Sequence, residues 1–286
     1  MQDGKALRAL DFMSSVRKLR LAGFVAAAAM SPNFSSAEPV AVLYSEGSLH
    51  GFLALRAPDG KVLADGDAFQ TVRGDEVTAH VVFHFKDGSL HDETTIYSQR
   101  QRFKLVSYRL VQKGPAFPQP LEMTIDGGNG KVGVRYHDEQ GRQQSADEHF
   151  DVPSDLANGM IPTLLKNLQP GAQPKSLSYI AATPQPRLVK LAVSRVGGDA
   201  FSLAGSRREA AHYVLKVEIG GIAGLLAPLA GKQPPDSHIW ILDGEVPAFI
   251  RADQPFYTGS PLWQIELATP TLPRTPVEVA STRNNR

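Results

Sequence analysis

The sequence predicts a mainly β protein, an antiparallel meander that forms an open barrel or a strongly curved sheet with one amphipathic helix packed on it. Two observations predict this fold. Short runs rich in Val, Ile, Phe, Tyr and Thr recur along the chain between turn signals made of Gly, Pro, Asn and Asp. Such spacing is typical of meanders, sandwiches and barrels. A single apolar stripe with helical spacing interrupts the series.

The predicted strands follow one another between identifiable turns. The first run, 48–56, leads into Pro58-Asp59-Gly60, where proline presets φ and glycine accepts a positive φ. Further strand-like runs lie at 103–112, 121–126, 131–137, 188–195, 212–219 and 238–242. Further turns are expected at 87–88, 127–130, 139–142, 197–199 and 243–244. No regular alternation of strands and helices, which would indicate a parallel sheet, is visible.

One helix is expected at residues 154–168. Its apolar stripe recurs every four residues, at Leu156, Met160, Leu164 and Leu168. Ser154 is the expected N-cap, and Pro162 should kink the helix or restart it. The stripe must be buried, and the nearest apolar surface is a face of the sheet.

Residues 1–37 have the order of a secretory signal peptide. A basic cluster (Arg17, Lys18 and Arg20) precedes the uncharged run 21–30, and residues 35–37 supply the small side chains of a cleavage site. The run is shorter than the roughly 20 residues that a membrane-spanning helix needs. We therefore expect export to the periplasm or the medium, with cleavage after Ala37. The alternative to a signal peptide is a buried Ala-rich helix. Translation starts at Met1 or, alternatively, at Met13.

The composition limits what the exported chain can do. Its 286 residues include no cysteine, which excludes disulfides, thiol chemistry and a cysteine-linked lipid anchor. Without residues 1–37 it has 25 basic and 27 acidic residues, a balance that favours neither nucleic acid nor an anionic membrane as a partner. We expect one domain over 38–269, without a membrane-spanning segment, and a disordered tail over 270–286.

Histidines and acids gather at 80–95, around an Asp87-Gly88 pair that is a strong hairpin signal. A two-residue turn there would place His84 opposite His91, with Cβ atoms about 5 Å apart, within reach of one metal ion. No metal site is predicted, because a one-residue slip separates this candidate pair. The same register puts Asp92 on the apolar face, next to outward-facing Glu93. Such an Asp92 is paired with an arginine, lines a polar patch, or indicates a different register.

Motifs for common enzyme classes are missing from the sequence. There is no G-x-S-x-G elbow, no H-E-x-x-H, no P-loop and no dinucleotide fingerprint. A pair of catalytic carboxylates has no characteristic spacing in the sequence. The sequence therefore neither supports nor excludes an enzymatic activity. No cofactor is expected.

Residues 220–231 form an uncharged segment whose glycines and proline oppose a long helix. It is a buried loop or short core helix, or else an apolar lip at the mouth of a cavity or a membrane-touching loop. This segment, the helix and the strand 238–242 contain the candidate residues for lining a ligand site. The alternative for each is that it is an ordinary core residue. The candidates are Leu156, Met160, Leu164, Ile222, Leu225, Leu226 and Trp240.

The runs 83–95 and 112–115 and the helix 156–168 resemble an uncharacterised family of exported bacterial β proteins. The resemblance covers most of residues 40–270 and implies no catalytic residues. More loosely, a meander with one helix is similar to periplasmic lipoprotein carriers, in which a half-barrel holds acyl chains against a helical lid. That likeness is an analogy of fold.

Three functions are compatible with these features. The first is the binding of a hydrophobic or lipid-like ligand in the open sheet. The second is a periplasmic hydrolase with an acid site near Asp92 and Glu93. The third is a structural envelope protein whose uncovered sheet edge pairs with a partner strand. The cavity volume, the surroundings of Asp92 and the coverage of the sheet edges distinguish these three functions.

Overall fold

A computed structural model describes residues 38–138, 140–169, 175–203, 205–218 and 234–270. The predicted leader, most of the predicted tail and the uncharged segment 220–231 lie outside the described residues. The strands are β1 (Leu49–Arg56), β2 (Val62–Arg73), β3 (Glu76–Phe85), β4 (Leu90–Ser98), β5 (Lys104–Lys113), β6 (Leu121–Asp126), β7 (Lys131–His137), β8 (Gln143–His149), β9 (Lys175–Ala181), β10 (Arg187–Leu203), β11 (Ser206–Glu218), β12 (Ser237–Leu242), β13 (Ala248–Gln254) and β14 (Trp263–Leu267). The helix is α1 (Ile161–Lys166).

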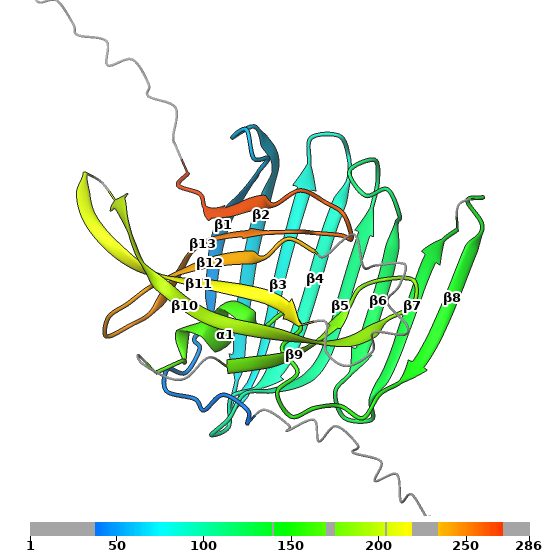
Figure 1. The fold of residues 1–286 in the computed structure, drawn as a ribbon, viewed down its shortest axis with the longest axis horizontal. Helices are drawn as coiled ribbons and strands as arrows, with labels where there is room; N and C mark the ends of the chain where they lie inside the picture. Colours follow the sequence, from blue (N-terminus) through cyan, green and yellow to red (C-terminus); the bar gives the residue numbers. More distant parts are fainter. Residues whose placement is uncertain (1–37, 139, 170–174, 204, 219–233, 271–286) are drawn as a thin grey trace, which may run out of the picture. The chain divides into compact units, whose positions relative to one another are not determined.

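All the strands named above belong to one antiparallel sheet that does not close (Figure 1). Its order is β8-β7-β6-β5-β4-β3-β2-β1-β14-β13-β12-β11-β10-β9. Every neighbouring pair except β1 and β14 is consecutive in sequence, and the consecutive strands β8 and β9 form the two edges. In that long-range pair Leu53 lies opposite Leu267. The predicted fold class, an unclosed antiparallel meander with one helix, is confirmed.

Two halves of the sheet share one apolar core. In Figure 1 strands β9–β13 cross in front of strands of the first half, while β8 lies clear of them at the right. Tyr97 and Met123 from the first half belong to the same buried cluster as Ile180 and Ile239 from the second. The connector between β8 and β9 contributes Met160, Leu165 and other side chains to this cluster. A smaller aromatic cluster joins Phe83, Phe85, Phe117 and Trp263.

The helix is shorter than predicted. It begins after Met160, which caps it without a side-chain hydrogen bond. Residues 154–160 form turns around an isolated bridge at Leu156, so the expected N-cap Ser154 is wrong. Pro162 lies in the first turn, the position that its missing N–H and fixed φ suit. Gly159, two residues before the first helical residue, has a φ of 67°, which is incompatible with a continuous right-handed helix. The proline therefore starts the helix instead of kinking it.

Residues 155–158 cover the free edge of β9. The Ala157 N–H donates to the Ser178 carbonyl at 2.9 Å, and the Asn158 side chain bonds both the N–H and the C=O of Ile180 at 2.9 Å. These bonds replace a neighbouring strand, so this edge of the sheet is closed to partners.

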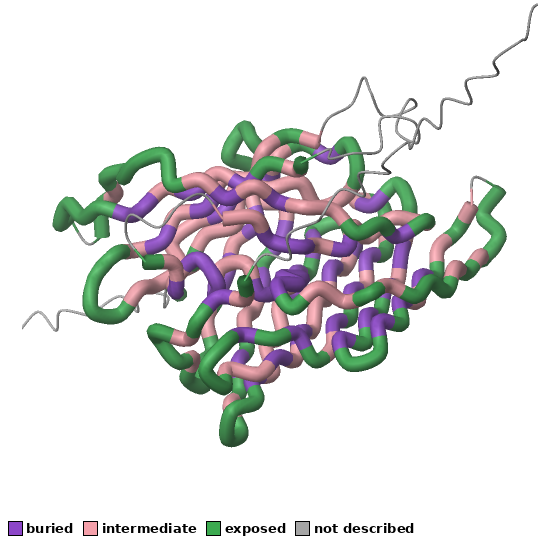
Figure 2. The backbone as a smooth tube through the Cα atoms, turned by 60° about the horizontal axis from the view of Figure 1, so that its bottom comes forward, coloured by how far each residue is buried: buried purple, intermediate pink, exposed green. Residues whose placement is uncertain are grey.

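The opposite edge strand, β8, pairs only with β7 among the described residues and carries no buried side chain (Figure 2). Its sequence, Gln-Gln-Ser-Ala-Asp-Glu-His, is polar and charged. Charged edges of this kind resist the addition of a foreign strand. An edge-pairing role therefore has little support from this strand.

Most predicted strand and turn positions agree with the structure. The runs 121–126 and 131–137 coincide with β6 and β7. The turn expected at 197–199 is wrong, because Gly197 to Asp199 continue β10 after a register shift that follows Arg195. Glycine inside a strand is typical of such a bulge. No helix among the described residues is long and apolar enough to span a membrane.

Candidate functional site

The β3–β4 hairpin has a three-residue turn, not the two-residue turn that was predicted. The Phe85 N–H donates to the Ser89 carbonyl and the Gly88 N–H donates to the Phe85 carbonyl, both at 3.0 Å. Gly88 has a φ of 84°, which completes a type I turn followed by a left-handed residue. The Asp87 carboxylate accepts a bond from the Ser89 N–H at 2.9 Å and stabilises this form. The register is therefore one residue away from the predicted one.

This register separates the candidate metal ligands. Phe83 lies opposite His91, and His84 lies opposite Leu90. His91 faces inward and is 7% exposed, whereas His84 is exposed on the outer face. The predicted cross-strand pair His84–His91 is wrong, and the described residues contain no group of three side chains able to hold a metal.

Asp92 and Glu93 point to opposite faces of the sheet, with the reverse of the predicted orientation. Asp92 faces outward, where its carboxylate lies 3.2 Å from Nε2 of His80. Glu93 faces inward, 3.5 Å from Nε2 of His91. Two carboxylates on opposite faces cannot act on one substrate, so Asp92 and Glu93 do not form one site. Each lies beside a histidine, and a hydrolase site near either acid stays a prediction.

Glu93 instead belongs to a polar network inside the sheet. Burial, and next the negative charge of Glu93, raise the pKa of Tyr108 well above its ordinary value. The same two causes, in the same order, raise the pKa of Tyr179. The other ring nitrogen of His91, Nδ1, lies 3.2 Å from the Gln112 side-chain nitrogen. That nitrogen donates a hydrogen bond to the Phe256 carbonyl at 2.7 Å. The network thus joins β4, β5, β9 and the loop before β14.

The candidate ligand-lining residues do not converge on a common cavity among the described residues. Leu156, Met160 and Leu164 are core side chains, each at most 3% exposed. Ile222, Leu225 and Leu226 lie outside the described residues. Trp240 faces the outer side, where its indole N–H donates to Asp199 at 2.7 Å and His212 stacks on its ring.

A broad groove of about 850 Å³ crosses the outer face of β4–β8. Besides Ile96, its floor consists of small or hydroxyl-bearing side chains of the outer face: Thr94, Ser107, Thr124, Gly133 and Ser145. Gly133 lies within β7 without a positive φ, so the backbone does not require glycine there. A Cβ atom at Gly133 would come within 3.2 Å of Thr124 Oγ1 and 3.3 Å of Asp147 Oδ1. The missing side chain at Gly133 therefore makes the groove deeper at this point. A glycine inside a strand can mark a site where a ligand approaches the backbone closely.

Charged side chains of both signs surround this floor. They are Arg109, Lys131, Arg135, Glu122, Asp126 and Asp147. Arg109 donates to Glu122 Oε1 at 2.8 and 3.2 Å, and Arg135 lies 4.0 Å from the same carboxylate. The three positive and three negative groups leave the groove without net charge.

Sequence reasoning did not detect this groove. Its residues come from five strands between positions 94 and 147 and converge only through the strand register. The alternation of polar and buried residues places them on the outer face, but an ordinary solvated face has the same pattern. The signal that was available is the glycine in the middle of β7.

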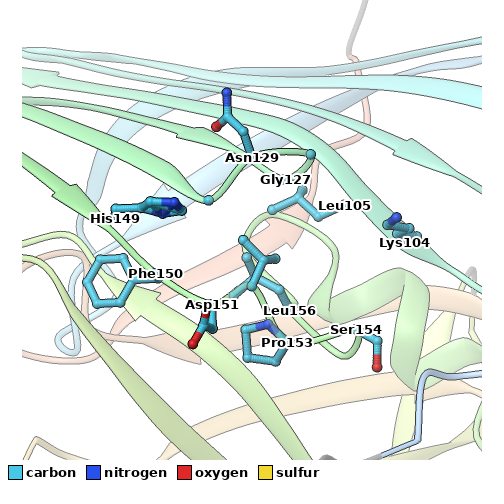
Figure 3. A pocket seen from close by; sticks show the side chains of 13 residues that line it. Lys104, Leu105, Gly127, Asn129, His149, Phe150, Asp151, Pro153, Ser154 and Leu156 are labelled. Atoms are coloured by element: carbon cyan, nitrogen blue, oxygen red, sulfur yellow. The ribbon is translucent and has the colours of Figure 1, made fainter.

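A second, smaller hollow of about 340 Å³ lies between the β6–β7 turn and the segment after β8 (Figure 3). His149, Phe150 and Asp151 line one side and Asn129 the other. The turn looks suited to an anion, but its N–H groups are occupied. Those of Gly128 and Asn129 donate to the Asp126 carboxylate at 2.8 and 3.2 Å. We therefore regard the outer groove as the stronger candidate.

The chain matches no family model and no curated protein. Among solved structures it is similar to a beta-barrel-like protein of the domain of unknown function DUF1849 from Brucella abortus. The TM-score is 0.43 and the sequence identity 11%, over 81% of this chain and 97% of that one. The expected resemblance to an uncharacterised family of exported β proteins, and with it export and a carrier-like role, stays a prediction.

Proposed function

We propose that this chain is an exported binding protein that holds an extended polar ligand in the outer groove. Export is inferred from the order of residues 1–37. The observation that supports binding is the contrast between the two faces of the sheet. The inner face is filled by the connector and the core, while the outer face of β4–β8 retains a hollow within the volume range of ligand sites.

Filling the groove tests this proposal. Thr124 is exposed on the groove floor, so Thr124→Trp would occupy the groove without disturbing the core. Thr71→Trp is the matched control, because Thr71 is an exposed position of β2 that does not line the groove. Each protein is produced with its leader, purified from the envelope fraction and examined by native mass spectrometry, and bound material is extracted and identified.

We expect a bound species with the wild type and with Thr71→Trp, and loss of that species with Thr124→Trp. Equal occupancy in both variants, or no bound species in any sample, would overturn the proposal. Thermal melting of all three proteins separates loss of binding from loss of folding.

A lipid-like ligand is the second candidate, because the inner face of the sheet is apolar and the uncharged segment 220–231 follows β11. Leu156, Met160 and Leu164 are fully packed, so an acyl chain would have to displace the connector. The same mass spectra test this candidate. An acyl-chain species that stays bound to Thr124→Trp would favour it over the groove.

A further inference from the structure

We infer that the ligand of the groove is an uncharged oligosaccharide that extends onto a row of aromatic rings on β1–β3. This inference rests on the proposed function and names the chemical class of its ligand.

One continuous row of paired positions leads from the groove to the aromatic rings. Consecutive partners along it are Asp147, Gly133, Thr124, Arg109, Thr94, His80, Phe69 and His50. Neighbouring strands lie about 4.8 Å apart, so the seven steps from β8 to β1 span about 34 Å. This length suits a chain of several units laid across the strands.

The aromatic end of the row exposes apolar surface in a fixed arrangement. Phe52 and Phe69 are 46% and 39% exposed. The His50 ring stacks on Phe69 at 4.2 Å between centroids, and the His80 ring follows at 6.0 Å. Exposed aromatic rings grouped together indicate an interaction site more strongly than isolated ones do.

Carboxylates hold the two histidines of this row. His50 Nε2 lies 2.8 Å from Asp67 Oδ1, and His80 Nε2 lies 3.2 Å from Asp92 Oδ1. The outer oxygens and ring nitrogens of these pairs are hydrogen-bonding groups placed beside apolar rings. A ligand that fits must therefore present apolar patches and hydrogen-bonding groups side by side.

The charge of the groove selects against ionic ligands. Its three cations and three anions balance, and the two arginines already share Glu122. A nucleic acid or an anionic lipid would require an excess of positive charge. The hydroxyls of Thr94, Thr124 and Ser145 suit a ligand that is polar without being charged.

An extended peptide fits this surface less well than a sugar chain. Peptides gain affinity from sheets by pairing with a free edge, but the groove lies on a face whose backbone groups are occupied by neighbouring strands. A pyranose ring has C–H groups on its faces, which pack on the negative face of an aromatic ring, and hydroxyls around its rim. Sheet faces bind oligosaccharides in other β folds.

The test uses the mature chain and defined probes in calorimetric titrations. The probes are neutral hexasaccharides (β-1,4-glucan, β-1,3-glucan, α-1,4-glucan and β-1,4-linked N-acetylglucosamine), their disaccharides, a sulfated hexasaccharide and an uncharged twelve-residue peptide. We expect at least one neutral hexasaccharide to bind at least about tenfold more tightly than its disaccharide. Phe69→Ala should weaken binding by about tenfold or more, whereas Phe69→Trp should retain it.

Val246→Ala is the matched control, because Val246 is 79% exposed in the β12–β13 turn and lies outside the row. Binding of the peptide or the sulfated sugar in preference to every neutral glycan would overturn the inference. Glycan binding that neither Phe69→Ala nor Thr124→Trp weakens would also overturn it. If no neutral glycan binds while the envelope-derived ligand is still lost from Thr124→Trp, the inference fails and the proposed function stands.

Discussion

At the residue scale, the connector is held by charged and polar side chains that left no signal in the sequence. The Asp155 side chain is fully buried and accepts hydrogen bonds from Ser178 Oγ at 2.7 Å and Lys190 Nζ at 3.1 Å. A buried carboxylate is tolerated only when such partners are present. This anchor fixes the first residues of the connector against β9 and β10.

Removing the charge of Asp155 should be costly. Asp155→Asn leaves Lys190 without its partner in a site where it is 21% exposed, so we expect the free energy of unfolding to fall by about 2–3 kcal/mol. Urea titration measures the change. Asp243→Asn is the control, since its pair with Arg195 is largely exposed and should contribute less than about 1 kcal/mol. Equal effects of the two substitutions would contradict the anchoring role.

His212 should make stability depend on pH. Burial, and next the neighbouring His238, lower the pKa of His212 below 6.5, against the opposing charges of Asp199 and Asp253. The folded state therefore binds this proton less readily than the unfolded state does. Its contribution to stability is present above pH 6.5 and is lost as the pH falls through the lowered pKa.

Comparison of melting curves between pH 7.5 and pH 5 measures this effect. We expect the wild type to lose more stability over this range than His212→Gln, which cannot be protonated. Parallel losses in the two proteins would show that His212 is not responsible for the pH dependence.

At the element scale, the junction before α1 depends on a close approach that only glycine permits. Gly159 has a φ of 67°, and a Cβ atom there would lie 1.8 Å from Thr95 Oγ1 of β4. The connector thus touches the inner face of the sheet at this point. A side chain would have to push the helix away from β4.

We expect Gly159→Ala to lower the free energy of unfolding by about 2 kcal/mol or more, because backbone strain and the clash with Thr95 add together. Gly141→Ala is the matched control. Its φ is 76° but nothing lies within 4 Å of the added Cβ atom, so only the strain, about 1 kcal/mol, should appear. Chemical denaturation of both variants measures the difference, and a smaller effect at Gly159 than at Gly141 would refute the close contact.

At the scale of the whole molecule, the meander could be predicted because its turns are local. The Pro58-Asp59-Gly60 and Asp243-Gly244 turns, and the strands 121–126 and 131–137, follow from residues adjacent in sequence. The pairing of β1 with β14 joins residues more than 200 positions apart, such as Leu53 and Leu267. No local property of either strand specifies that partner, and the outer groove likewise depends on the register of five strands.

The sequence by itself determined the antiparallel β class, most strand positions, the absence of cysteine chemistry and the burial of Leu156, Met160 and Leu164. Only the tertiary structure decided that Glu93 and His91 face inward while Asp92 faces outward. The physical reason is that side chains alternate along a strand. One additional turn residue at Asp87-Gly88 therefore exchanges the two faces of β4. The Asp-Gly pair suits both a two-residue and a three-residue turn, so these residues alone do not specify which turn forms.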